Sequence, residues 1–173
     1  MLEKGYVHVY TGTGKGKTTA MLGLTLRAVG AGLRVYIGQF VKSMAYCEVK
    51  AIEEYLPNVI SERYGPGCLL GRKPTPEDAE ITKQGFKKAI NAISSGDYDI
   101  VMLDEINVAI YLGLLDVESV LEVIRQKPEN VELVLTGRFA PPEIINSADL
   151  VSEISEVKHY YTTGVLSREG IDR

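Results

Sequence analysis

Apolar residues in this chain follow two alternating patterns: compact runs of β-branched and aromatic residues, and longer stretches in which apolar positions recur at helical spacing. The compact runs predict strands and the longer stretches predict helices. The predicted strands are Tyr6–Tyr10, Leu33–Phe40, Val59–Tyr64, Tyr98–Leu103, Val131–Thr136 and Leu150–Ile154, with a short final segment near Val165. The predicted helices are Lys17–Val29, Ala45–Leu56, a third from Pro76 to Gly96, and a fourth that Asp116 caps and that runs through Gln126.

The third helix has a distinct set of start signals. Thr75 can cap it, Pro76 suits its first position, and Glu77 and Asp78 place acidic side chains in its first turn. Residues 65–74, just before it, are dense in glycine and proline, which predicts a substantial loop. The residues expected to face the core are Met21, Leu22, Leu24, Leu26 and Ala28 in the first helix, and Phe86, Ile90 and Ile93 in the third.

A glycine-rich segment, Thr11–Thr19, joins the first strand directly to the first helix. In that context glycines let backbone N–H groups turn toward an anion, and the helix N-terminus adds its dipole. Lys17 supplies a positive charge for phosphates, and the Thr18 hydroxyl can bind Mg²⁺. The loop is one residue shorter than the usual phosphate-binding pattern, and the alternative is a glycine-rich turn with two solvated lysines. We predict that the chain binds a nucleoside triphosphate through Gly12, Thr13, Gly14, Lys15, Gly16, Lys17, Thr18 and Thr19.

An acidic side chain is expected at the end of a neighbouring strand, where it can hold the metal directly or through water. Asp104 and Glu105 follow the apolar run Ile100–Leu103 and meet this expectation. Because the two acids are adjacent, either could reach the metal. The alternative interpretation is that they cap the helix that follows.

The order of the elements predicts the fold class. Strand and helix alternate with short connections, which favours an α/β protein with helices on both faces of a mostly parallel sheet. The glycine loop after the first strand makes this a three-layer P-loop NTPase-like (RecA-like) arrangement. A length of 173 residues suits one nucleotide-binding domain over residues 1–173.

Composition narrows the range of partners. The net charge of −4 argues against nucleic acid, because such proteins normally carry a basic surplus. No apolar run approaches the roughly 18 residues of a membrane helix, and the first residues lack the pattern of a signal peptide. Cys47 and Cys68 fit neither a disulfide framework nor a metal site. We therefore expect a cytoplasmic protein with no nucleic-acid or membrane partner.

Several short motifs occur in a specific order along nearly the whole chain. They are the loop sequence GTGKGKTT, Arg27–Gly30, Gln39–Lys42, Leu103–Glu105, Thr136–Arg138, Lys158–His159 and Gly164–Asp172. The ordered set resembles the P-loop-type corrinoid adenosyltransferases (ATP:cob(I)alamin adenosyltransferases). The resemblance implies an enzyme that transfers the 5′-deoxyadenosyl group of ATP to Co(I) of a corrinoid, either cobalamin or a precursor, and releases triphosphate. It also implies Mg²⁺, an electron donor that forms Co(I), and a homodimer.

The resemblance assigns roles to single residues. Lys17, Thr18 and Glu105 form the implied catalytic set, in which Lys17 stabilises the departing triphosphate and the other two bind Mg²⁺; Glu105 is favoured over Asp104. Arg138 follows a strand at the ligand-binding edge of the sheet and would contact phosphate or ribose, the alternative being a surface arginine. Further implied substrate contacts are Arg27, Gln39, Lys158 and His159, and for Arg27, Lys158 and His159 a structural role is the alternative.

Two other functions stay open on the residues alone. A P-loop ATPase or small-molecule kinase would release ADP, although the short loop and the lack of an obvious water-activating residue weigh against it. An ATP-dependent corrinoid-binding module would hold both ligands without turnover. That reading is favoured by residues 65–70, which lack the aromatic pair that family members often carry near the corrin.

Overall fold

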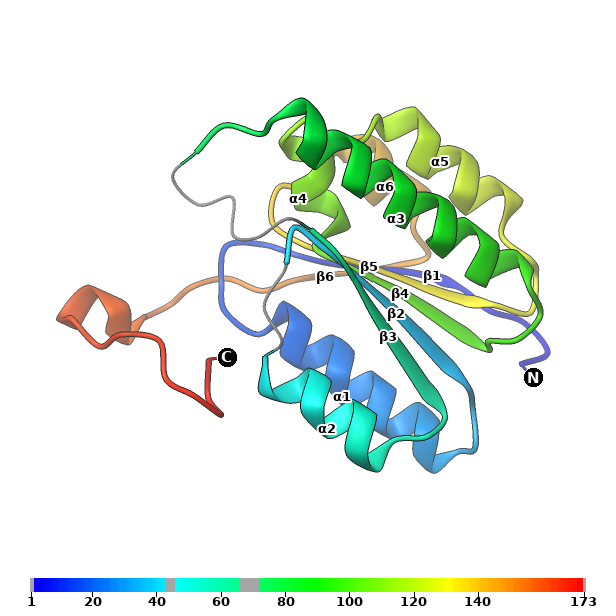
Figure 1. Ribbon diagram of the computed structural model, residues 1–173, viewed down its shortest axis with the longest axis horizontal. Helices are drawn as coiled ribbons and strands as arrows, with labels where there is room; N and C mark the ends of the chain where they lie inside the picture. The colour runs from blue at the N-terminus through cyan, green and yellow to red at the C-terminus, as the bar shows by residue number, and fades with distance from the viewer. Residues whose placement is uncertain (1, 43–45, 66–71, 173) are drawn as a thin grey trace.

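A computed structural model describes residues 2–42, 46–65 and 72–172 of the chain. Within them, six strands form one all-parallel sheet in the order β3-β2-β4-β5-β1-β6, and helices cover both faces (Figure 1). The strands are β1 (Val7–Thr11), β2 (Val35–Phe40), β3 (Val59–Tyr64), β4 (Ile100–Asp104), β5 (Glu132–Thr136) and β6 (Leu150–Glu153). The helices are α1 (Lys17–Gly30), α2 (Cys47–Tyr55), α3 (Pro76–Ser94), α4 (Ile106–Tyr111), α5 (Val117–Gln126), α6 (Pro142–Ser147) and the 3₁₀ helix η1 (Tyr160–Thr163).

The sheet separates two hydrophobic cores. One lies under α1 and α2, and the other lies under α3, α4, α5 and α6 (Figure 1). Neighbouring residues of a strand serve opposite cores, as Tyr36 and Ile37 do in β2, because successive side chains point to opposite faces. The central strands β2 and β4 are buried along their whole length, which explains why they read as continuous apolar runs. The predicted three-layer α/β class is confirmed.

Two apolar residues expected in the core are exposed. In α1, Leu26 is 64% exposed, and Thr25 takes the inward position, where its hydroxyl donates to the Met21 carbonyl at 3.1 Å. In α3, Ile90 is 37% exposed, and Ala89 faces the sheet beside it. Helical spacing identified both helices correctly, but it did not fix which side of each helix the sheet covers.

The close approach of α3 to the sheet depends on a small residue. A Cβ on Gly85 would lie 2.2 Å from the Tyr64 ring, so only glycine lets that ring lie beneath the helix. The start of α3 is as predicted: the Thr75 hydroxyl accepts the backbone N–H of Asp78, whose carboxylate in turn accepts the N–H of Thr75.

Other boundaries differ from the sequence predictions in informative ways. The short helices α4 and α6 were not predicted, because each spans fewer than two turns and shows too little periodicity. The segment near Val165 forms no strand, and η1 precedes it instead. The predicted glycine- and proline-rich loop, which lacks the aromatic pair of many family members, lies mostly in residues 66–71, outside the described residues. No helix in the described part of the chain is both long and apolar enough to span a bilayer.

Candidate active site

The segment between β1 and α1, named here the glycine loop (residues 12–16), is pressed against the chain that leaves β6. Gly12 and Gly16 have φ angles of 99° and 121°, a region that favours glycine. A Cβ on Gly12 or Gly14 would lie 2.5 or 2.8 Å from the carbonyl oxygen of Ile154. The Gly14 N–H donates to that same carbonyl at 2.7 Å. The compact loop therefore needs glycine both for its turn and for this contact.

Lys17 lies inside the loop that it follows. Its side chain is buried, and its Nζ donates to the carbonyl oxygens of Gly12 at 2.8 Å and Gly14 at 2.7 Å. Burial lowers the pKa of Lys17, and the nearby Arg138 guanidinium lowers it further. The loop thus holds the Lys17 ammonium group where the glycine backbone meets the start of α1.

Asp104, at the carboxyl end of β4, is fully buried and is held by four side chains. Its Oδ1 accepts the hydroxyl of Thr18 at 3.0 Å and that of Thr136 at 2.7 Å. Its Oδ2 accepts the Lys42 ammonium at 2.7 Å and the Gln39 amide at 3.3 Å. Burial disfavours the charged form of Lys42, but the Asp104 carboxylate outweighs burial and raises the pKa of Lys42. The buried carboxylate therefore has its countercharge in place.

Glu105 has a different environment from its neighbour. Its backbone is left-handed, with φ at 61°, and its N–H donates to the Thr136 hydroxyl at 3.0 Å. Among the described residues its carboxylate forms no hydrogen bond or ion pair, although it lines the cleft described below. Burial raises the pKa of Glu105, and the adjacent Asp104 raises it further. Glu105 stands at the N-cap position of α4 but its side chain makes no capping bond, so helix capping does not explain it.

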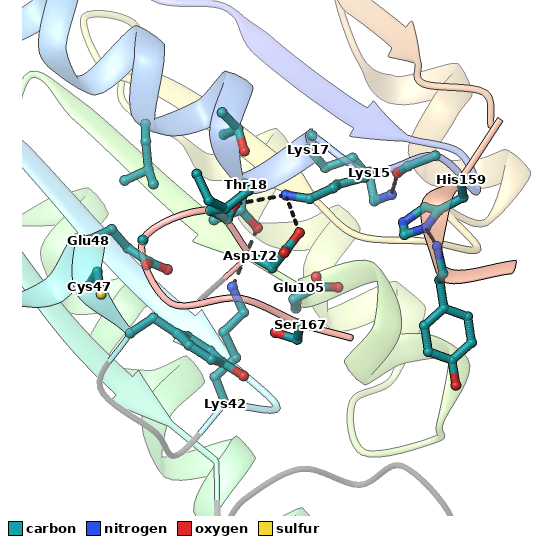
Figure 2. Close-up of a pocket in the computed structure, with 18 of the residues that line it drawn as sticks. Lys15, Lys17, Thr18, Lys42, Cys47, Glu48, Glu105, His159, Ser167 and Asp172 are labelled. Carbon is teal, nitrogen blue, oxygen red and sulfur yellow. Dashed lines mark hydrogen bonds and ion pairs between the residues drawn. The ribbon is translucent and has the colours of Figure 1, made fainter. Parts of the chain in front are cut away.

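A cleft of about 730 Å³ lies over the glycine loop, at the carboxyl edge of the sheet (Figure 2). Lys15–Thr19, Lys42, Glu105 and Arg138 line it together with residues of the C-terminal segment. Its size is within the range of small-molecule sites, and its position at the carboxyl ends of parallel strands is where α/β proteins bind ligands.

The C-terminal segment (residues 154–172) folds back over the loop. The Lys15 Nζ pairs with the Asp172 carboxylate at 3.2 Å and donates to the Ile171 carbonyl at 3.0 Å. Tyr160 donates its hydroxyl to Asp172, and His159 lines the same cleft. In Figure 2, Asp172 lies near the centre of the view and His159 near its right edge, and both come from this segment.

The predicted site residues fall into three groups. The loop residues Gly14–Thr19 line the cleft together with Glu105, Arg138 and His159. Gln39 and Asp104 lie behind it: the Gln39 amide donates to Asp104, which also accepts the Thr18 hydroxyl. The remaining predicted residues are not among the lining residues: Gly12, Thr13, Arg27 and Lys158. Arg27 is in the last turn of α1, roughly 15 Å along the helix from Lys17.

Sequence reasoning did not single out three participants: Lys42, Thr136 and Asp172. Lys42 lies two residues beyond the end of β2, and Thr136 ends β5. Both strands are neighbours of β4, so the strand order brings these residues to Asp104. A signal was present, because both stand in the ordered motifs, but their role depends on which strands are adjacent.

Comparison with known proteins identifies the family to which the chain belongs. Residues 3–172 match the family described as ATP:corrinoid adenosyltransferase BtuR/CobO/CobP. The chain belongs to this family.

Curated relatives of this adenosyltransferase family align with almost all of the chain. The corrinoid adenosyltransferase of Pseudomonas aeruginosa is 33% identical over 171 residues, covering 98% of this chain and 84% of its own length. The corrinoid adenosyltransferase of a Sinorhizobium species is 34% identical, with coverages of 98% and 81%. That of Escherichia coli K12 is 32% identical, with coverages of 98% and 86%.

Proposed function

We propose that this protein transfers the 5′-deoxyadenosyl group of ATP to the Co(I) centre of a corrinoid and releases triphosphate. The observation that carries the proposal is the cleft itself, which joins a short glycine loop around Lys17 to the Glu105 carboxylate, a group with no hydrogen-bond or ion-pair partner among the described residues. Membership of the corrinoid adenosyltransferase family supplies the reaction class.

The proposed reaction requires the protein to stabilise triphosphate as a leaving group. The electron pair of Co(I) forms the bond to C5′, the C5′–O bond breaks, and its electrons leave on triphosphate, so no proton transfer is needed. The Lys17 ammonium and the loop N–H groups would stabilise the negative charge that develops on that oxygen. Arg138, which lines the cleft, would add a second positive charge for phosphate or ribose.

The residues present fit a magnesium ion. Thr18 and Glu105 offer the hydroxyl and carboxylate oxygens that Mg²⁺ prefers, and when bound the ion would neutralise charge on the triphosphate. The Thr18 hydroxyl donates to Asp104 and its oxygen accepts the Lys42 ammonium at 3.4 Å, which leaves a second lone pair for a metal ion in the cleft. Asp104 already accepts four hydrogen bonds and is paired with Lys42, so we assign it the role of a positioning residue and Glu105 that of the ligand.

The remaining roles are carried over from the family resemblance. We propose that His159 and Lys158, in the C-terminal segment, lie toward the corrinoid, and that Gln39 acts through Asp104 rather than on the substrate. The position of Arg27 at the far end of α1 favours a structural role there. We also propose that the protein works as a cytoplasmic homodimer supplied with Co(I) by a separate electron donor.

An anaerobic assay tests the proposal. Purified protein, Mg-ATP and chemically reduced cob(I)alamin should give a light-sensitive alkylcobalt product that absorbance spectra detect. Lys17→Ala should lower the rate by about a hundredfold or more, because one preorganised charge contact is lost. Lys50→Ala, at an exposed lysine of α2, is the matched control and should behave as the wild type. Near-normal turnover by Lys17→Ala would contradict the role given to Lys17, and ATP binding without an alkylcobalt product would favour a binding module.

A further inference from the structure

Two exposed aromatic side chains stack on each other at the carboxyl edge of the sheet. Tyr111 ends α4 and Phe139 follows β5, and their ring centroids lie 4.2 Å apart with planes 26° from parallel. Tyr111 is 62% exposed and Phe139 is 52% exposed. The pair therefore presents flat apolar surface to the outside and contributes little to either core.

The backbone at Phe139 is also unusual. Its φ is 63°, in the left-handed region that residues other than glycine seldom adopt. The preceding Gly137 has a φ of 129°, and the Ala140 N–H reaches the Thr11 hydroxyl at 3.4 Å, so the turn is tied to the end of β1. An aromatic residue in a strained conformation that leaves its ring exposed is not explained by folding, and such outliers gather at functional sites.

The pair adjoins the cleft without lining it. Arg138, next to Phe139 in the chain, lines the cleft, as does Glu105, which immediately precedes α4. Tyr111 is one and a half helical turns beyond, roughly 8 Å along α4, which Figure 1 shows at the same edge of the sheet as the glycine loop. A nucleotide bound over the glycine loop therefore leaves the pair, together with the His159 side of the cleft, to the second, larger substrate.

We propose that Tyr111 and Phe139 form a stacking platform for the corrin ring of that second substrate, an inference that rests on the proposed function. A corrin is a broad, flat, conjugated macrocycle with apolar methyl groups at its rim, and it matches the outer face of a stacked aromatic pair. The platform holds the corrin beside the cleft mouth, where the nucleotide carbon that it must reach is presented. Tyr111 and Phe139 set corrinoid affinity and leave ATP affinity unchanged.

The test compares corrinoid and ATP binding in single variants. Phe139→Gly removes the ring at a backbone conformation that glycine favours, so the variant should fold, and Tyr111→Ala removes the other ring. Tyr55→Ala removes an equally exposed tyrosine at the end of α2 and is the control. The dissociation constant of cob(II)alamin in the presence of Mg-ATP is measured first, followed by the KM values for cob(I)alamin and for ATP.

Each platform variant should weaken cob(II)alamin binding and raise the cob(I)alamin KM about tenfold, with the ATP KM changed less than twofold. Unchanged corrinoid binding in both variants would overturn the platform. A rise in the ATP KM instead would assign the pair to adenine, and a change of oligomeric state would assign it to a second copy of this chain; either result also overturns it. If the wild type binds cob(II)alamin but transfers no adenosyl group, the proposed function fails while the binding comparison still decides the platform.

Discussion

The ion pair between Lys42 and Asp104 is open to a quantitative test with Lys42→Met. The two charges lie 2.7 Å apart, the Asp104 side chain is fully buried, and only 16% of the Lys42 side chain is exposed. Methionine keeps most of the apolar stem but removes the charge. The substitution therefore leaves a buried carboxylate without its countercharge.

The size of the effect follows from the environment of Asp104. Removing one partner of a buried pair costs about 3–5 kcal/mol. Thr18, Thr136 and Gln39 still donate to the carboxylate, which places the expected loss at the lower end, about 3 kcal/mol. For 173 residues this lowers Tm by about 8 °C. Because the pKa of Lys42 is raised in the folded state, the pair contributes fully at neutral pH and is lost only as pH rises through that pKa.

Thermal unfolding followed by circular dichroism at pH 7 measures the loss in a double-mutant cycle. Lys42→Met should cost much less in an Asp104→Asn background than in the wild type, because the pair is already broken there. Lys88→Met is the control: Lys88 is 64% exposed, lies 3.3 Å from Glu62, and should change stability by less than about 1 kcal/mol. An equal loss from Lys42→Met in both backgrounds would refute the pairing argument.

Two further predictions concern acid dependence and packing. Because the pKa of Glu105 is raised and its ionised form binds the metal, activity should fall as pH drops through a value above that of an ordinary glutamate. The pH profile of kcat/KM for Glu105→Gln should lack this acid limb. Persistence of the limb in that variant would exclude Glu105 as the titrating group. Gly85→Ala should destabilise the protein by about 1–3 kcal/mol, because the new Cβ would lie 2.2 Å from the Tyr64 ring. Gly23→Ala in α1, where a Cβ meets nothing within 4 Å, should stabilise the protein by about 0.5–1 kcal/mol. Denaturant midpoints of the two variants compare these effects, and equal shifts would contradict this packing.

The loop residues were predictable because their chemistry is contiguous in sequence. A strand, a run of glycines, Lys17 and Thr18, and then a helix form one local unit, and the structure keeps that unit intact. The choice between Asp104 and Glu105 was not settled by the residues alone. The fold separates them, because the last residue of β4 points among the ends of its neighbouring strands while the left-handed turn directs the next residue to the cleft.

The partners of Asp104 could not be derived in the same way. Lys42 and Thr136 reach it only because β2 and β5 flank β4, and the sequences of short parallel strands do not indicate the order of the strands in the sheet. The contact of Lys15 with Asp172 joins residues near opposite ends of the chain, and nothing in the local pattern of either segment indicates it. Long-range geometry of this kind is set by how the layers pack.

The most direct test of the proposed chemistry identifies the phosphate product. Wild-type protein, Mg-ATP and cob(I)alamin are incubated without oxygen, and the nucleotide products are separated by ion-exchange chromatography. Leaving-group stabilisation by the glycine loop predicts triphosphate in one-to-one ratio with adenosylcobalamin. ADP in place of triphosphate, with the cobalt left unalkylated, would mean that the cleft catalyses phosphoryl transfer and would contradict the proposed function.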